Sequence, residues 1–83
     1  MSQDQEWLVR LQFLEEAQEY LSTMESELLG LSSKGVTQEG YNSILRAAHS
    51  IKGGSALMGF AELSQVAHRL EDFFKVLRAG SSS

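Results

Sequence analysis

Apolar side chains recur at helical spacing along three segments of the chain, and short polar or glycine-containing breaks separate the segments. In the first segment, about residues 4–31, the apolar positions are Val9, Phe13, Ala17, Tyr20, Leu21, Met24, Leu28 and Leu31. Polar side chains, among them Glu15 and Glu19, occupy the opposite side. This pattern predicts one long amphipathic helix.

Two further helices are predicted after short breaks. Gly35 interrupts the first pattern, and Thr37 is placed to cap a helix over about residues 38–57. The core face of that helix is expected to hold Tyr41, Ile44, Leu45, Ala48, Ile51 and Ser55. A third helix, about residues 60–77 after a turn at Gly59, is expected to bury Leu63, Val66, Ala67, Leu70, Phe73, Phe74 and Leu77. Gly80 then indicates a helix stop.

Short connections place consecutive helices antiparallel, so the sequence predicts an all-α fold, an antiparallel up-down helical bundle. We expect one domain over residues 1–80 and a flexible end or linker at residues 81–83. A chain of 83 residues has no room for a second core of useful size. A nucleotide-binding catalytic domain is therefore excluded from this chain.

Charge and composition narrow the function further. Seven Lys and Arg face eleven Asp and Glu, a net charge of −4, which disfavours nucleic acid as a partner. The absence of Cys excludes disulfides and thiol chemistry. No apolar run approaches the roughly 18 residues of a membrane span, and the acidic start lacks the basic region of a secretory signal. We therefore expect a cytoplasmic protein with no membrane partner.

Polar residues with chemical potential lie beside the apolar faces of the second and third helices. Helical spacing groups one strip on the second helix: His49, Lys52, Gly53 and Ala56. The matching flank of the third helix holds His68, Glu71 and Lys75. An antiparallel hairpin through the Gly59 turn can bring these flanks together, with His49 partly exposed.

This grouping suits a nucleophilic histidine. Such an imidazole must be neutral, accessible, and held in one tautomer by a partner on its other nitrogen, a role that fits Glu71. An ammonium such as Lys52 can offset the negative charge of a phosphoryl group on His49. Gly53 and Gly54 cost the helix roughly 1 kcal/mol each relative to Ala, and we expect their missing side chains to clear the approach of a docking protein. A lone histidine would more often be a solvated surface residue.

The phosphoacceptor motif of histidine phosphotransfer (HPt) domains, especially the N-terminal P1 domain of CheA-type kinases, resembles residues 47–60, AAHSIKGGSALMGF. The likeness continues upstream in residues 13–17, FLEEA, and downstream in residues 68–72, HRLED. The resemblance implies that His49 is the phosphoacceptor through Nε2 and that Glu71 bonds the other ring nitrogen. It also implies that Lys52 and His68 line the site, and that Gly53 keeps the approach open.

The resemblance also implies a function. The domain is expected to be a non-catalytic phosphocarrier in a two-component, chemotaxis-like system, and its parent chain a histidine protein kinase. His49 would accept phosphoryl from an ATP-dependent histidine kinase catalytic domain and pass it to the aspartate of a response-regulator receiver domain. No cofactor is expected in this domain, because ATP and Mg belong to the partner kinase domain.

In the family four helices close the bundle, whereas the pattern here predicts three, with the fourth missing. The uncovered apolar strip leads us to expect a homodimer. Two alternatives are compatible with the same residues. The first is a structural helical dimerisation or interaction module in which His49 is incidental. The second is a metal site made by His49, His68 and Glu71, which Lys52 would oppose by repelling the cation.

Overall fold

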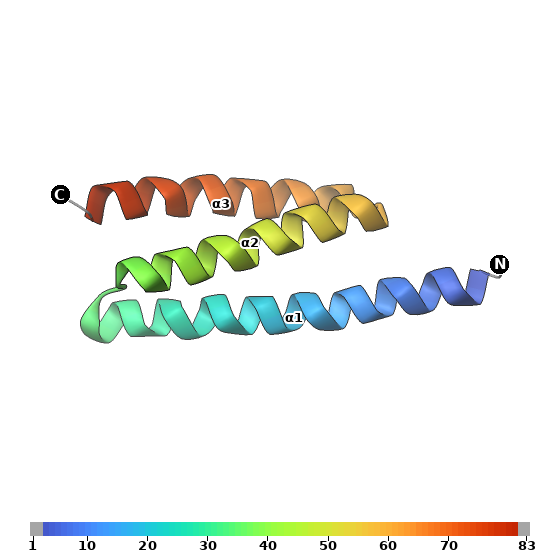
Figure 1. The fold of residues 1–83 in the computed structure, drawn as a ribbon, viewed down its shortest axis with the longest axis horizontal. Helices are drawn as coiled ribbons and strands as arrows, with labels where there is room; N and C mark the ends of the chain where they lie inside the picture. Colours follow the sequence, from blue (N-terminus) through green and yellow to red (C-terminus); the bar gives the residue numbers. More distant parts are fainter. Residues whose placement is uncertain (1–2, 82–83) are drawn as a thin grey trace.

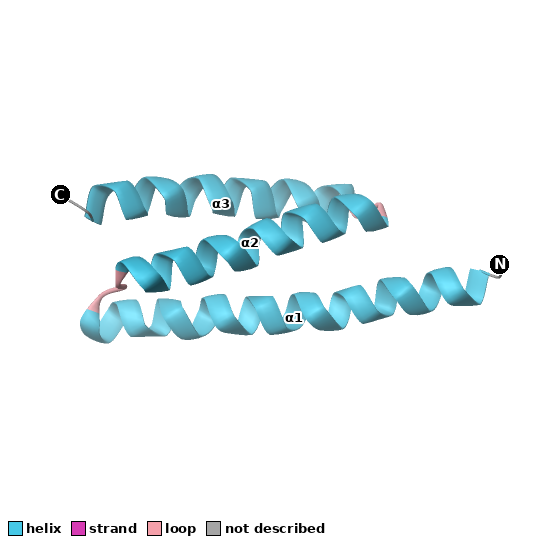
Figure 2. Cartoon of the chain, in the orientation of Figure 1, coloured by secondary structure: helices cyan, strands magenta, loops and turns pink. Residues whose placement is uncertain are grey.

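Three α-helices form the chain in the computed structural model, which describes residues 3–81. They are α1 (Gln3–Lys34), α2 (Gln38–Met58) and α3 (Ala61–Ser81). Consecutive helices run antiparallel, and α2 lies between the other two (Figure 1). Within the described residues every connection is a short loop and no strand is present (Figure 2). The predicted all-α helical bundle is confirmed.

Local chemistry explains where α2 begins and ends. The Thr37 hydroxyl accepts a hydrogen bond from the backbone N–H of Gly40 at 3.0 Å, which satisfies one of the free N–H groups of the first turn. At the other end Gly59 adopts a left-handed conformation with φ 85°, which glycine tolerates best. The N–H of Phe60 then donates to the Ser55 carbonyl at 2.7 Å. These bonds turn the chain directly into α3.

The core is built around α2, which packs against both α1 and α3. The buried apolar residues of α2 are Tyr41, Ile44, Leu45, Ala47, Ala48 and Ile51. From the outer helices come Phe13, Ala17 and Met24 on α1, and Ala67 and Phe74 on α3. Among the described residues, the backbones of α1 and α3 do not approach each other closely, since no Cα atom of one lies within 8 Å of a Cα atom of the other. The bundle is therefore open along the side where α1 and α3 face each other.

This open side corrects the predicted burial. Among the residues expected in the core, Val9, Leu21 and Leu28 of α1 are exposed, and so are Val66 and Phe73 of α3. Helical periodicity identified apolar faces correctly, but two of those faces have no neighbouring helix to cover them. The side chain of Leu31 lies outside the described residues.

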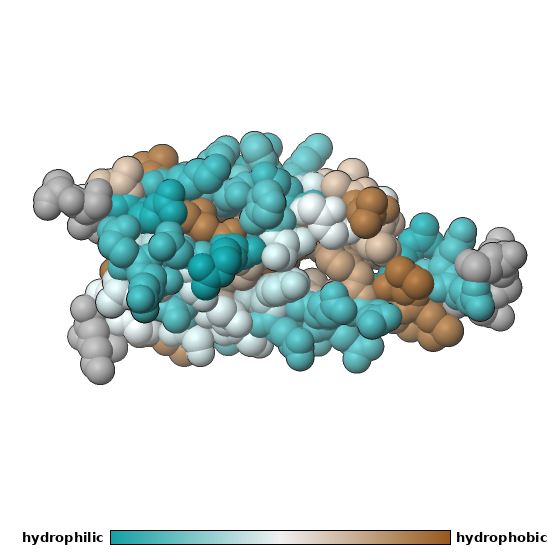
Figure 3. Space-filling model, viewed as in Figure 1, coloured by the Kyte–Doolittle hydropathy of each residue, from teal (hydrophilic) through white to brown (hydrophobic). Residues whose placement is uncertain are grey.

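The helix ends also differ from the sequence prediction. The first helix continues through Lys34, and the third continues through Gly80 to Ser81, so Gly80 is not a helix stop. Ser81, which was expected in a flexible end, is therefore helical, and residues 82–83 lie outside the described range. α1 is the longest helix, and its N-terminal part extends beyond the turn between α2 and α3 (Figure 1). Apolar surface gathers near that end (Figure 3), where Leu8 and Leu57 are exposed. No helix in the described range has the length and apolarity to cross a membrane.

Candidate functional site

His49 lies on the fourth turn of α2, next to the core but outside it. Its neighbours Ala48 and Ile51 are buried, while 69% of the His49 side chain is exposed. The helix therefore holds the backbone of His49 rigidly while the ring stays accessible to another protein. The partial exposure expected from helical spacing is what the structure shows.

Glu71 brings α3 to this histidine. One carboxylate oxygen, Oε2, lies 3.1 Å from Nδ1 of His49, and the other, Oε1, accepts a hydrogen bond from Nζ of Lys52 at 2.6 Å. The Glu71 side chain is only 8% exposed. An ionised carboxylate can only accept hydrogen bonds, so the His49 contact requires the proton on Nδ1. Nε2 is then left with its lone pair, on the ring nitrogen away from Glu71.

The charge state of Glu71 follows from its partners. The hydrogen bond from Lys52 holds the pKa of the Glu71 carboxyl below its ordinary value, burial opposes this, and the His49 contact and the charges of Lys52 and Lys75 add to the lowering. Glu71 is accordingly ionised at neutral pH. A permanently ionised acceptor is the group needed to fix the tautomer of a neutral histidine.

Lys52 contacts the same carboxylate as His49. Its ammonium donates to Glu71, where it is part-buried, and its expected role beside a phosphoryl group on His49 stays a prediction. Lys52 therefore holds the carboxylate that in turn holds the imidazole.

His68 is not brought to His49 directly. Its Nε2 lies 3.4 Å from Oδ2 of Asp72, one turn along the same helix, and both side chains are largely exposed. His68 and Lys52 do share a shallow hollow of about 270 Å³ on the surface between α2 and α3. Within the described part of the chain, no group of three or more His, Cys, Asp and Glu side chains could hold a metal ion.

The two glycines after Lys52 have different surroundings. A Cβ added at Gly53 would meet nothing within 4 Å, so this position is open. A Cβ added at Gly54 would overlap the ring of Phe13 on α1. Phe13 in turn stacks on Phe60, with ring centroids 6.1 Å apart. Gly54 therefore permits α1 to pack closely on α2, and its expected role in docking stays a prediction.

Two serines that the site analysis of the sequence did not single out contact the backbone of Lys52. The hydroxyls of Ser64 on α3 and of Ser55 on α2 each donate to the Lys52 carbonyl at 3.1 Å. Ser55 is fully buried and also donates to the Ile51 carbonyl at 2.5 Å. Sequence spacing had placed Ser55 on the core face, but nothing in the sequence marked Ser64.

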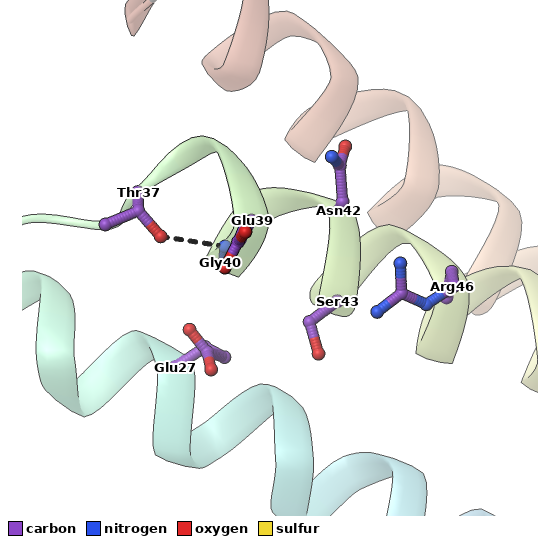
Figure 4. Close-up of a pocket in the computed structure, with 7 residues that line it drawn as sticks. All are labelled: Glu27, Thr37, Glu39, Gly40, Asn42, Ser43 and Arg46. Carbon is purple, nitrogen blue, oxygen red and sulfur yellow. Dashed lines mark hydrogen bonds between the residues drawn. The ribbon is translucent and has the colours of Figure 1, made fainter.

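A further polar hollow, which His49 does not line, lies over the first part of α2 (Figure 4). Its volume is about 470 Å³ and it is lined by Glu27, Thr37, Glu39, Gly40, Asn42, Ser43 and Arg46. The Thr37 hydroxyl is engaged in capping α2, and the Asn42 side chain accepts a hydrogen bond from Arg78. These residues serve the junction between the helices.

Comparison with known proteins identifies the family. Residues 9–83 match the Hpt domain family. The chemotaxis protein CheA of Klebsiella aerogenes is 48% identical over 60 residues, which is 72% of this chain and 9% of that protein. CheA of Salmonella typhimurium is 43% identical over 68 residues, and CheA of Halobacterium salinarum 35% over 69, covering 82% and 83% of this chain and 10% of each relative.

The chain thus spans about a tenth of the length of these curated relatives. No solved structure matches it significantly. The family match covers nearly the whole chain and includes α2, α3 and α1 from residue 9 onward, together with His49 and Glu71. The chain belongs to the Hpt domain family.

Proposed function

We propose that this domain is a phosphocarrier of a two-component system in which His49 carries the phosphoryl group on Nε2. The observation that supports this most directly is that the two sides of the imidazole ring have different surroundings. Nδ1 contacts buried Glu71 at 3.1 Å, and the ring is otherwise exposed. A nucleophile needs this combination of a fixed tautomer and an accessible lone pair. Membership of the Hpt family supports the same role.

The proposed transfer has two steps. In the first, the Nε2 lone pair of His49 forms a bond to the γ-phosphorus of ATP held by a histidine kinase catalytic domain, and ADP leaves with the electrons of the broken P–O bond. Glu71 keeps the proton on Nδ1 and stabilises the positive charge that the ring acquires. In the second, a carboxylate oxygen of a receiver-domain aspartate bonds to phosphorus and the N–P electron pair returns to Nε2.

The remaining partners follow from this role. The domain supplies the nucleophile, while ATP and Mg are used by the kinase domain, so the domain alone is not a catalyst. The parent protein that we propose is a cytoplasmic CheA-like histidine kinase, and the receiver belongs to its response regulator. A chemotaxis pathway is favoured because the similar curated proteins are chemotaxis proteins.

We also propose that a second copy of this chain covers the open side of the bundle. The groove between α1 and α3 has a volume of about 500 Å³, and its apolar walls include Leu21, Met24, Leu28, Leu70 and Phe74. Phe73 and Val76 lie exposed on the same helix as Leu70 and Phe74. A homodimer can bury such a face, because each copy offers both a groove and apolar side chains to fill it. A pure interaction module, our second candidate function, would use the same groove but leave His49 without a role.

Replacing His49 by Gln separates the two candidate functions. Gln keeps polarity but has no nucleophilic ring nitrogen, so His49→Gln should remove phosphoryl acceptance while leaving the helical circular dichroism spectrum unchanged. Radiolabelled ATP and a CheA kinase domain provide the measurement, and the wild-type label should be lost in acid and survive in base.

His68→Gln is the matched control, because it removes the other histidine and should still become labelled. An unlabelled wild type would refute the phosphocarrier role. A label that persists in His49→Gln would place the acceptor elsewhere.

A further inference from the structure

Three residues of α3 make side-chain hydrogen bonds to α2, and they stand at regular intervals. Ser64, Glu71 and Arg78 are seven residues apart along α3, so they lie on one face of the helix. Ser64 bonds the Lys52 carbonyl, Glu71 contacts the side chains of His49 and Lys52, and Arg78 donates to the side chain of Asn42. The site's carboxylate is therefore the middle of three polar links along one seam.

The link at Ser64 holds the backbone of α2 rather than a side chain. Its hydroxyl donates to the Lys52 carbonyl at 3.1 Å, in a part-buried position. The same carbonyl accepts from buried Ser55. A backbone carbonyl cannot change rotamer. The length of this bond therefore depends on the position of α3 along the axis of α2. Lys52 is itself one of the two residues that Glu71 must reach.

The link at Arg78 fixes the other end of the seam. Its Nη1 donates to Oδ1 of Asn42 at 2.7 Å, near the start of α2. Seven residues separate Arg78 from Glu71, the same interval as between Ser64 and Glu71. The two outer links thus bracket the carboxylate on both sides.

The apolar contacts of α3 with the core are supplemented by these polar links, which depend more sharply on the axial position of α3. Among the described residues of α3, Ala67 and Phe74 are buried in the core, and Leu63, Leu70 and Leu77 are partly buried against it. Hydrophobic burial is non-directional, whereas a hydrogen bond is lost within a few tenths of an ångström beyond about 3.5 Å. Sliding α3 by one residue would move it about 1.5 Å along α2, enough to break the short contacts of Glu71.

We propose that Ser64, assisted by Arg78 through Asn42, is a positioning residue that sets the register of α3 so that Glu71 reaches His49 and Lys52 together. The inference rests on the proposed phosphocarrier function for its kinetic consequence, but its structural consequence concerns only the tautomer of His49. Loss of the Ser64 hydroxyl lets α3 shift, and the Glu71 carboxylate then holds Nδ1 of His49 for only part of the time.

The test compares Ser64→Ala with Ser64→Thr, which restores a hydroxyl at the same position. Nitrogen-15 NMR of the His49 ring measures which nitrogen carries the proton, and single-turnover phosphorylation by a CheA kinase domain with ATP measures the rate. We expect the wild type to hold the proton on Nδ1 and Ser64→Ala to show a mixture of tautomers. Because misplacement by about 1 Å can cost up to about 100-fold, we expect Ser64→Ala to be phosphorylated roughly threefold to tenfold more slowly.

Ser64→Thr should recover both the tautomer and the rate, and the double variant Ser64→Ala/Asn42→Ala should be slower than either single variant. Glu71→Ala provides the reference for complete loss of the contact, and Gln65→Ala, on the exposed neighbouring position of α3, is the matched control that should behave as wild type. If Ser64→Ala fails to melt cooperatively, Asn42→Ala and Ser64→Thr decide by the same two measurements.

The inference is overturned if Ser64→Ala and the double variant keep the wild-type tautomer and phosphorylate within twofold of wild type. It is also overturned if Ser64→Thr behaves like Ser64→Ala although it is folded. A wild type that is never phosphorylated would instead refute the proposed function, while the NMR measurement would still decide on the positioning role.

Discussion

At the residue scale, one buried carboxylate organises the site. Glu71 uses its two oxygens on two partners from the same face of α2, His49 and Lys52. An unpaired carboxylate at this depth would carry a large desolvation cost, so each partner makes the burial tolerable and is itself held in place. The tautomer of His49 and the position of the Lys52 ammonium are therefore set by the same group.

The lowered pKa of Glu71 predicts how stability changes with pH. Because its pKa in the folded domain lies below the ordinary value of 4.5, ionised Glu71 stabilises the fold fully above that value, and the stabilisation is lost as pH falls through the lowered pKa. Glu71→Gln lacks this titration. We expect the variant to be less stable than wild type at pH 7 by about 1.5–3 kcal/mol, as for loss of a hydrogen bond to a charged group.

Urea unfolding of both proteins at several values between pH 7 and pH 3 measures the difference in the free energy of unfolding. The other titrating groups are common to both proteins, so the difference isolates Glu71. It should shrink below the ordinary glutamate pKa and vanish at the acid end. A difference that stays constant with pH would show that the carboxylate's charge contributes nothing to folding.

The sequence predicted part of this site. Spacing on two antiparallel helices was enough to bring Glu71 to His49, because helical periodicity fixes which side chains share a face. It could not show that Lys52 would bond Glu71, since a flexible lysine has several partners within reach. Ser64 was missed because its acceptor is a backbone carbonyl, which every residue carries and no sequence pattern marks.

At the element scale, the sequence predicted the ends of a helix correctly where neighbouring residues cap it. It predicted them wrongly where no such cap ends the helix. The second helix was expected over about residues 38–57 and is found at Gln38–Met58, because Thr37 and Gly59 terminate it locally. The third helix passes through Gly80, where glycine was expected to stop it. A glycine inside a helix costs only about 1 kcal/mol, so its presence does not force a helix to end.

The adjacent glycines of α2 provide a matched test of helix packing. Gly53→Ala adds a methyl group into open space and improves helix propensity, so it should stabilise the domain by up to about 1 kcal/mol. Gly54→Ala places the same methyl group against the ring of Phe13 and should destabilise it by about 1–3 kcal/mol. Urea midpoints of the two variants measure both effects. Equal stabilities would contradict the close approach of α1 to α2 at Gly54.

At the scale of the whole molecule, the missing contact between α1 and α3 explains most errors in predicted burial. Periodicity alone assigns an inward face to each helix, but a face is buried only if another element covers it. Phe73 and Val66 of α3 are 57% and 54% exposed, so no described helix covers them. The sequence therefore predicted the faces of the helices better than it predicted which faces would be covered.

The open groove leads to a prediction about assembly. Each large apolar side chain left in water forgoes about 1.5–3 kcal/mol of burial, and several such residues together approach the ~5–15 kcal/mol by which whole domains are stable. A second copy that lays its own α1 and α3 on this groove would recover much of that burial. His49 projects from α2, the helix between α1 and α3, so it can stay accessible at the rim of such a dimer.

Light scattering after size exclusion at micromolar concentration should therefore give twice the chain mass of 9.2 kDa. Leu21 lines the groove and is exposed, so Leu21→Glu should shift the mass to that of one chain by placing a charge in the interface. Leu57 is more exposed but lies at the end of α2, outside this groove, and Leu57→Glu should leave the dimer intact.

A wild-type mass near 9.2 kDa with cooperative melting would refute the dimer, because it would show that three helices are stable with the groove uncovered. A dimer that Leu57→Glu disrupts and Leu21→Glu does not would move the interface to the N-terminal end of α1, where Leu8 and Trp7 are exposed.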